Sequence, residues 1–187
     1  MILERSSNIK VTTVTKVVDA MEHILICYAT RYGSTAGIAA IIADELRHAG
    51  CEVTLSPVSD VDDPGGFDAV VIGSPLYMGK WLVEAREFVS RFRNSLHSRP
   101  VAVFSAGFTL RERTRDHLSA VDEALRSSVN LFISPVSTGY FAGSLDTDRL
   151  SAADREIITL TGAMPGDFRE PDEIKKWART LPALFFG

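Results

Sequence analysis

Residues 23–35, HILICYATRYGST, decide the fold. Their first part, 23–29, is a short apolar run of the kind that forms a strand buried on both faces of a sheet. The remainder is polar and contains a glycine, and an apolar face at helical spacing follows it. That face consists of Ile38, Ile41, Ile42 and Leu46. A buried strand that runs through a short loop into an amphipathic helix predicts the first β-α unit of a parallel sheet.

The same alternation continues along the chain. Further strands are predicted at 51–57, 68–73, 100–106 and 135–141, and further helices at 82–92, 118–129 and 174–185. Pro171 suits the first turn of the last helix, and Pro182 is expected to end or kink it. We therefore predict an α/β sandwich with a five-stranded, mostly parallel, doubly wound sheet. Such sheets bind ligands at the carboxyl ends of their strands.

The composition is that of an ordinary globular domain. Of 187 residues, 45% are apolar and 24% are charged, and 20 basic against 24 acidic residues give a net charge of −4. This balance argues against a nucleic-acid binder, which needs a basic face. No run approaches the roughly 18 apolar residues of a transmembrane helix. Residues 1–20 also lack the apolar core of a secretory signal.

The cysteines and histidines predict neither a disulfide nor a metal site. Cys27 and Cys51 belong to no C-x-x-C pair, and two thiols in a domain of this size fit a reducing, cytoplasmic setting. Cys27 lies in the first apolar run, where we expect a buried and inert thiol. The four histidines are scattered without the spacing of metal ligands.

Two segments lie outside the predicted core, which we expect to form one domain over 21–187. Residues 1–20 are a Thr/Val-rich extension, for which a flexible tail, an added edge strand and a start at Met21 all stay open. Residues 143–169 form a long connection before the last helix. A short helix is predicted within this connection at 151–160, because its first residues resemble a capping box.

Residues suited to an anion follow the first strand. This first loop comprises Thr30, Arg31, Tyr32, Gly33, Ser34 and Thr35. Hydroxyls, a glycine and free backbone amides at the start of a helix are typical of a phosphate site. The alternative is a turn in which Ser34 or Thr35 only caps the helix. The spacing matches neither a P-loop nor a classical dinucleotide-binding motif, which argues against ATP, GTP and NAD.

Two further loops carry small and aromatic side chains. The second loop comprises Ser74, Pro75, Leu76, Tyr77, Met78 and Gly79, and Trp81 follows it. The third loop comprises Ser105, Ala106, Gly107, Phe108 and Thr109. Flat or polarisable side chains can stack on a heteroaromatic ring, and small residues let backbone amides reach its polar edge. The alternatives are a capping loop with Met78 and Trp81 in the core, and a tight turn with positive φ at Gly107.

The spacing of the three loops resembles that of the flavodoxin-like proteins that bind FMN. Thr30-x-x-Gly33-x-Thr35 is similar to the family's phosphate loop, although Tyr32 stands where many members have Thr. The second and third loops are similar to its two ring-contact loops. The resemblance implies a three-layer flavodoxin-like sandwich with the FMN phosphate in the first loop. The implied neighbours of the flavin ring are Tyr77, Met78, Trp81, Gly107 and Phe108.

Within that family, the chain looks most like the quinone-dependent protoporphyrinogen oxidases and the stand-alone flavodoxin-domain proteins. Residues 30–35, 73–81, 87–89 and 166–169 carry this resemblance. The membrane-associated oxidases have a basic, aromatic insert in the place of the connection. Here, residues 143–168 contain five acidic residues and two arginines. An anionic membrane repels such a segment, which argues against membrane-coupled quinone chemistry.

The resemblance implies a redox protein in which non-covalent FMN supplies the chemistry. Three functions stay open: an electron carrier for a redox partner protein, a protoporphyrinogen oxidase-type dehydrogenase that uses a quinone or another small acceptor, and a cofactor-free binding module. No residue stands out as a catalytic acid or base. Arg31 either offsets the phosphate charge or faces solvent. A phosphoacceptor receiver domain is a poor fit, because Thr30 and Gly73 stand where it needs acidic residues.

Overall fold

Five parallel strands form the centre of the molecule, in the order β2-β1-β3-β5-β6. They are β1 His23–Tyr28, β2 Glu52–Pro57, β3 Ala69–Tyr77, β5 Val101–Gly107 and β6 Ser137–Ala142. The computed structural model describes residues 21–161 and 164–187, so the predicted extension at 1–20 lies outside the described residues. The α/β fold with a five-stranded, doubly wound parallel sheet is therefore confirmed.

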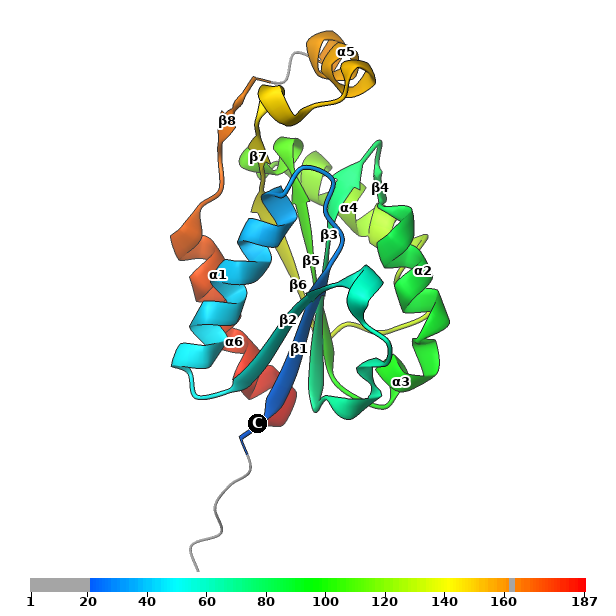
Figure 1. Cartoon of the computed structure of the whole chain (residues 1–187), viewed down its shortest axis with the longest axis vertical. Helices are drawn as coiled ribbons and strands as arrows, with labels where there is room; N and C mark the ends of the chain where they lie inside the picture. Colours follow the sequence, from blue (N-terminus) through cyan, green and yellow to red (C-terminus); the bar gives the residue numbers. More distant parts are fainter. Residues whose placement is uncertain (1–20, 162–163) are drawn as a thin grey trace, which may run out of the picture.

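Helices cover both faces of this sheet (Figure 1). One face carries α1 Ser34–His48 and α6 Pro171–Phe186, and the other carries α2 Val83–Arg91, α3 Arg93–His97 and α4 Arg115–Arg126. Side chains of β1 alternate between the two layers: Ile24 and Ile26 pack toward α1 and α6, whereas Leu25 and Cys27 pack toward the opposite helices. This alternation is the reason why the whole run is apolar. Burial also raises the pKa of the Cys27 thiol, as expected for an inert cysteine.

Two local predictions need correction. Strand β3 does not stop at Gly73 but runs on to Tyr77, where it pairs with the short antiparallel strand β4 Lys80–Trp81. The segment between β2 and β3 contains two short 3₁₀ turns, η1 Val58–Asp60 and η2 Pro64–Gly66. Helix α6 does not end at Pro182 but continues to Phe186, because its face of Ile174, Ala178 and Leu181 is fully buried against the sheet and α1.

The connection lies beyond the carboxyl ends of the strands (Figure 1). It contains β7 Ser144–Leu145, η4 Thr147–Arg149, α5 Ala152–Thr161 and β8 Gly166–Asp167. Strands β7 and β8 form an antiparallel pair, and α5 stands above them at the end of the molecule. The predicted helix within the connection is thereby confirmed. Within 21–161 and 164–187, no helix is long and apolar enough to cross a membrane.

Candidate functional site

A cavity of about 130 Å³ opens at the carboxyl ends of the strands. It lies between the three loops that the sequence singles out and the beginning of the connection. Its lining residues are Thr30, Arg31, Tyr32, Ser34, Thr35, Pro75, Leu76, Tyr77, Ala106, Gly107, Phe108, Gly143, Ser144 and Leu145. Most of the polar side chains that line this cavity belong to the first loop.

The first loop is shaped by its own backbone. Gly33 has a φ of 87°, in the left-handed region that favours glycine, and it stands directly before α1. Its amide donates a hydrogen bond of 3.0 Å to the Thr30 hydroxyl. Gly33 itself does not line the cavity, because this turn directs it toward Arg149 and the connection. The first amides of α1 have no partner within the helix and lie at this turn.

The two hydroxyls at the start of α1 have different roles. The Ser34 hydroxyl accepts a hydrogen bond of 2.7 Å from the amide of Ser144, which ties the connection to the first loop. The Thr35 side chain is 1% exposed and lines the cavity. Among the described residues, its hydroxyl is the one buried side-chain polar group with no hydrogen-bond partner. Neither hydroxyl caps α1, so the simple capping interpretation is wrong.

Residues of the second loop divide between the cavity and the framework. Pro75, Leu76 and Tyr77 line the cavity. Ser74 is fully buried, and its hydroxyl accepts from the Leu82 amide at 3.0 Å, so it holds the loop from behind. Met78 is 79% exposed with a φ of 51°, and Gly79 follows it with a φ of 73°. Neither residue lines the cavity, because this tight turn directs the chain away from it.

Trp81 does not lie where the sequence analysis placed it, beside a ligand ring. Its side chain is 1% exposed, and its indole nitrogen donates a hydrogen bond of 2.8 Å to the Ser105 hydroxyl. Because Trp81 lies in the core beside Ser105 of β5, it does not line the cavity, and the prediction that it flanks a ligand ring is wrong. Ser105 is buried by the same contact and does not line the cavity.

The third loop places Ala106, Gly107 and Phe108 on the cavity wall. Gly107 has an extended backbone with a φ of −171°, so the alternative of a positive-φ turn is wrong. The ring of Phe108 contacts the ring of Phe168 edge-on, with 5.5 Å between their centroids. The Arg111 guanidinium covers the Phe108 ring at 4.3 Å. The end of the connection therefore fixes the aromatic side chain of this loop.

Three lining residues were absent from the predicted site, namely Gly143, Ser144 and Leu145. They follow the fifth strand directly. The rule that ligands bind at carboxyl strand ends points to this position, but the residue types there carry no chemical signal of their own. Asp154 is a further residue whose role the sequence did not indicate.

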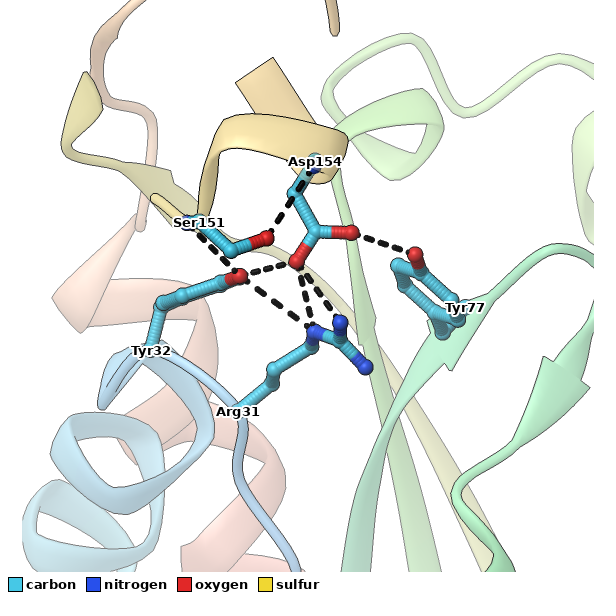
Figure 2. A network of polar contacts seen from close by, with 5 residues as sticks. All are labelled: Arg31, Tyr32, Tyr77, Ser151 and Asp154. Atoms are coloured by element: carbon cyan, nitrogen blue, oxygen red, sulfur yellow. Dashed lines mark hydrogen bonds and ion pairs between the residues drawn. The ribbon is translucent and has the colours of Figure 1, made fainter. Parts of the chain in front are cut away.

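Asp154 of α5 joins the connection to the first and second loops (Figure 2). One carboxylate oxygen accepts from the Arg31 guanidinium at 2.8 Å and from the Tyr32 hydroxyl. The other accepts from the Tyr77 hydroxyl at 2.5 Å. Hydrogen bonds from Tyr32 and then Tyr77 are the main causes that lower the pKa of Asp154 to about 2. The carboxylate is therefore ionised at neutral pH, and its bond raises the pKa of Tyr77.

Only half of the predicted capping box forms. The Asp154 amide donates to the Ser151 hydroxyl at 3.1 Å, as a helix start requires. The Asp154 carboxylate does not return to the Ser151 amide, which donates instead to the Tyr32 hydroxyl at 3.3 Å. The acidic side chain of the motif is thus used for contacts with the cavity walls.

Arg31 is occupied by these same neighbours. Besides the ion pair with Asp154, its guanidinium lies over the Tyr77 ring, 4.5 Å from the centroid. Hydrogen bonds to Tyr32 and Asp154 raise its pKa. Because Arg31 is paired in this way, its charge is balanced within the protein and one face of Tyr77 is covered.

The chain is similar to known proteins in sequence and in structure. It is 29% identical over 144 residues to protoporphyrinogen IX dehydrogenase [quinone] of Escherichia coli strain K12, which covers 76% of this chain and 80% of that protein. Its fold is similar to flavodoxin 2 of Bacillus cereus, with a TM-score of 0.56, 20% identity and coverage of 87% of this chain and 99% of the other. The corresponding values for a Streptococcus pneumoniae TIGR4 flavodoxin are 0.57, 20%, 86% and 98%.

A domain family also matches most of the chain. The flavodoxin domain matches residues 25–172, which include all three loops, the connection and the sheet except the first two residues of β1. The strand order agrees with this match. This chain belongs to the flavodoxin domain family.

Proposed function

We propose that this chain is a redox protein that binds FMN non-covalently at the carboxyl ends of its strands. One observation carries the proposal: Thr35 lines the cavity, and its buried hydroxyl has no partner among the described residues. A buried hydroxyl left unsatisfied costs about 1–3 kcal/mol. A phosphate oxygen would satisfy it, and the neighbouring amides and positive end of α1 would stabilise the phosphate charge.

The rest of the cavity suits the flavin ring. Tyr77 and Phe108 stand on its walls, and the backbone of Ala106 and Gly107 lies where the polar edge of a ring would approach. Arg31 contributes less than its charge suggests, because Asp154 already neutralises it. The flavin, once bound, supplies the redox chemistry, while these residues bind and orient it. Membership of the flavodoxin domain family supports this choice of cofactor.

Two uses of such a cofactor remain as candidates. The sequence similarity to the E. coli enzyme favours a dehydrogenase that oxidises protoporphyrinogen IX and reduces a quinone. The acidic connection favours a carrier that docks on a basic redox partner protein, since opposite charges steer such encounters. An assay with protoporphyrinogen IX and a soluble quinone distinguishes them: turnover identifies the enzyme, and transfer only to a partner protein identifies the carrier.

The cofactor is tested by the visible absorption of the purified protein before and after incubation with FMN. We expect the absorption bands of an oxidised flavin to remain after excess FMN is removed. Thr35→Asp should weaken FMN binding about 100-fold or more, because its carboxylate would face the phosphate. The matched control Thr35→Ser keeps the hydroxyl and should still bind.

Either of two results would contradict the proposal. A colourless chain that ignores added FMN would leave the cofactor-free binding module as the better interpretation. If Thr35→Asp binds as tightly as the unmodified chain, the phosphate does not lie in the first loop.

A further inference from the structure

Asp154 is an unusual residue for its position. It belongs to α5, whose neighbouring residues Arg155 and Glu156 are exposed, yet its own side chain is only 4% exposed. A buried carboxylate is costly unless charged or polar groups surround it. Here, three side chains provide that compensation, and all of them come from outside the connection. The contact therefore specifies where α5 lies.

The partners of Asp154 belong to two different loops that line the cavity. Arg31 and Tyr32 come from the first loop, and Tyr77 comes from the second (Figure 2). All three line the cavity, whereas Asp154 does not. The carboxylate thus ties the two loops together from outside the space that a ligand would occupy.

The tie closes the cavity on the side between the two loops. The side chains that it joins, Arg31, Tyr32 and Tyr77, all line the cavity of about 130 Å³. A flavin that enters or leaves on this side must therefore move the first and second loops apart. Because Asp154 bridges these loops, such a movement must break its bond to Tyr77 or its bonds to Arg31 and Tyr32.

We propose that Asp154 is the latch of a strap, formed by α5, that closes over the cofactor and controls how fast FMN enters and leaves. The proposal rests on the proposed function for the identity of the ligand. Asp154 acts as a positioning residue, since it reaches the cavity only through Arg31, Tyr32 and Tyr77. The Ser34–Ser144 bond and the Phe108–Phe168 contact anchor the two ends of the connection, so α5 can lift while its ends stay attached.

A latch has a kinetic signature that other roles lack. It stabilises the closed state through protein groups alone, with or without flavin, so it slows association and dissociation by the same factor. Its loss raises both rate constants and leaves their ratio, the dissociation constant, nearly unchanged. A residue that contacts the cofactor would instead raise the dissociation rate constant alone and weaken affinity. A residue needed only for folding would change the unfolding midpoint of the whole domain.

The experiment compares Asp154→Ala and Asp154→Asn with the unmodified chain in stopped-flow measurements of FMN fluorescence. The control is Glu156→Ala, which removes an exposed acidic side chain from the same helix. For Asp154→Ala, we expect both rate constants to rise at least about tenfold. Asp154→Asn retains an oxygen that can accept from a tyrosine but loses the ion pair. Its rate constants should therefore lie between those of the unmodified chain and those of Asp154→Ala. Unchanged rates, or a rise in dissociation alone, would overturn the latch.

Hydrogen exchange of the cofactor-free chain tests the latch independently of FMN. We expect the amides of α5 to exchange at least about tenfold faster in Asp154→Ala, with no change in the strands of the sheet. Equal protection of α5 in the variant and in the unmodified chain would overturn the proposal. The unmodified chain could fail to bind FMN while the amides of α5 still exchange faster in Asp154→Ala. The proposed function would then be wrong, and the role of Asp154 in holding α5 over the cavity would be supported.

Discussion

The first loop and the connection border the same cavity but are held in different ways. Within residues 30–35, the shape depends on a bond of 3.0 Å between residues three positions apart and on the left-handed backbone of Gly33. Within the connection, the position of α5 depends on side-chain bonds from Asp154 to residues 77 to 123 positions away. Local backbone geometry makes one wall, and long-range side-chain contacts make the cover.

This difference assigns different tasks to the two regions. A turn fixed by its own backbone between a buried strand and a buried helix is rigid, which suits a site for a phosphate. A cover attached by a few side chains can detach at a modest cost in free energy, because local opening depends on how many contacts must break. Rigidity at the first loop and opening at the connection are together what a site needs to hold a cofactor and still exchange it.

Among the regions compared, the part of β3 beside the first loop should be the least tolerant of substitution. Gly73 accepts a bond from the Ala29 amide at the entrance of the first loop, and a Cβ at Gly73 would overlap the ring of Phe104. That ring is fully buried. Gly73→Ala should therefore lower the free energy of unfolding by about 3 kcal/mol, measured by urea denaturation. Gly66→Ala is the control, because nothing lies within 4 Å of its added Cβ. Equal stability of both variants would show that this framework adapts as easily as the connection does.

Sequence reasoning recovered the parts of the molecule that depend on local patterns. A continuous apolar run made β1 recognisable, helical periodicity located α1 and α6, and the rule on strand ends brought the three loops to one edge of the sheet. Each of these signals lies within about fifteen neighbouring residues or follows from parallel topology.

The misses have a common physical origin. Trp81 carries the same aromatic side chain whether it stacks on a ligand or donates to Ser105 in the core, and only the packing of β5 decides between the two. Asp154 fits a capping box in sequence, yet its carboxylate bonds to Arg31, Tyr32 and Tyr77 and not to the start of its own helix. Partners that are distant in the chain leave no local pattern.

The pH dependence of α5 docking provides a second test of the difference between the first loop and the connection. The pKa of Asp154 is lowered to about 2 in the folded chain and is about 3.9 in an unfolded one. Its contribution to docking of α5 is therefore complete above about pH 4 and is lost as the pH falls through 2. We expect α5 to lose protection from hydrogen exchange over this range. In Asp154→Asn, the same amides should show no such step, and a step that persists there would assign it to another group.

The smallest expected effect concerns the contact between α1 and the end of the connection. Gly37 lies in the second turn of α1, and an added Cβ would meet the tip of the Arg169 side chain. Replacing a helical glycine with alanine gains about 0.5–1 kcal/mol. Because the neighbouring atom is the far end of a flexible side chain, we expect Arg169 to move aside, and Gly37→Ala should stabilise the fold by about 0.5 kcal/mol.

A double-mutant cycle with Arg169→Ala isolates the cost of that movement. If Arg169 only occupies the space beside Gly37, the gain from Gly37→Ala should increase by a few tenths of a kcal/mol when Arg169 is absent. Chemical denaturation of the four proteins gives this coupling directly. Should Gly37→Ala instead destabilise the chain by more than about 1 kcal/mol, the Arg169–Asp167 pair, at 2.5 Å, is a rigid part of the site. The end of the connection would then resemble the first loop in rigidity, and only α5 would remain free to open.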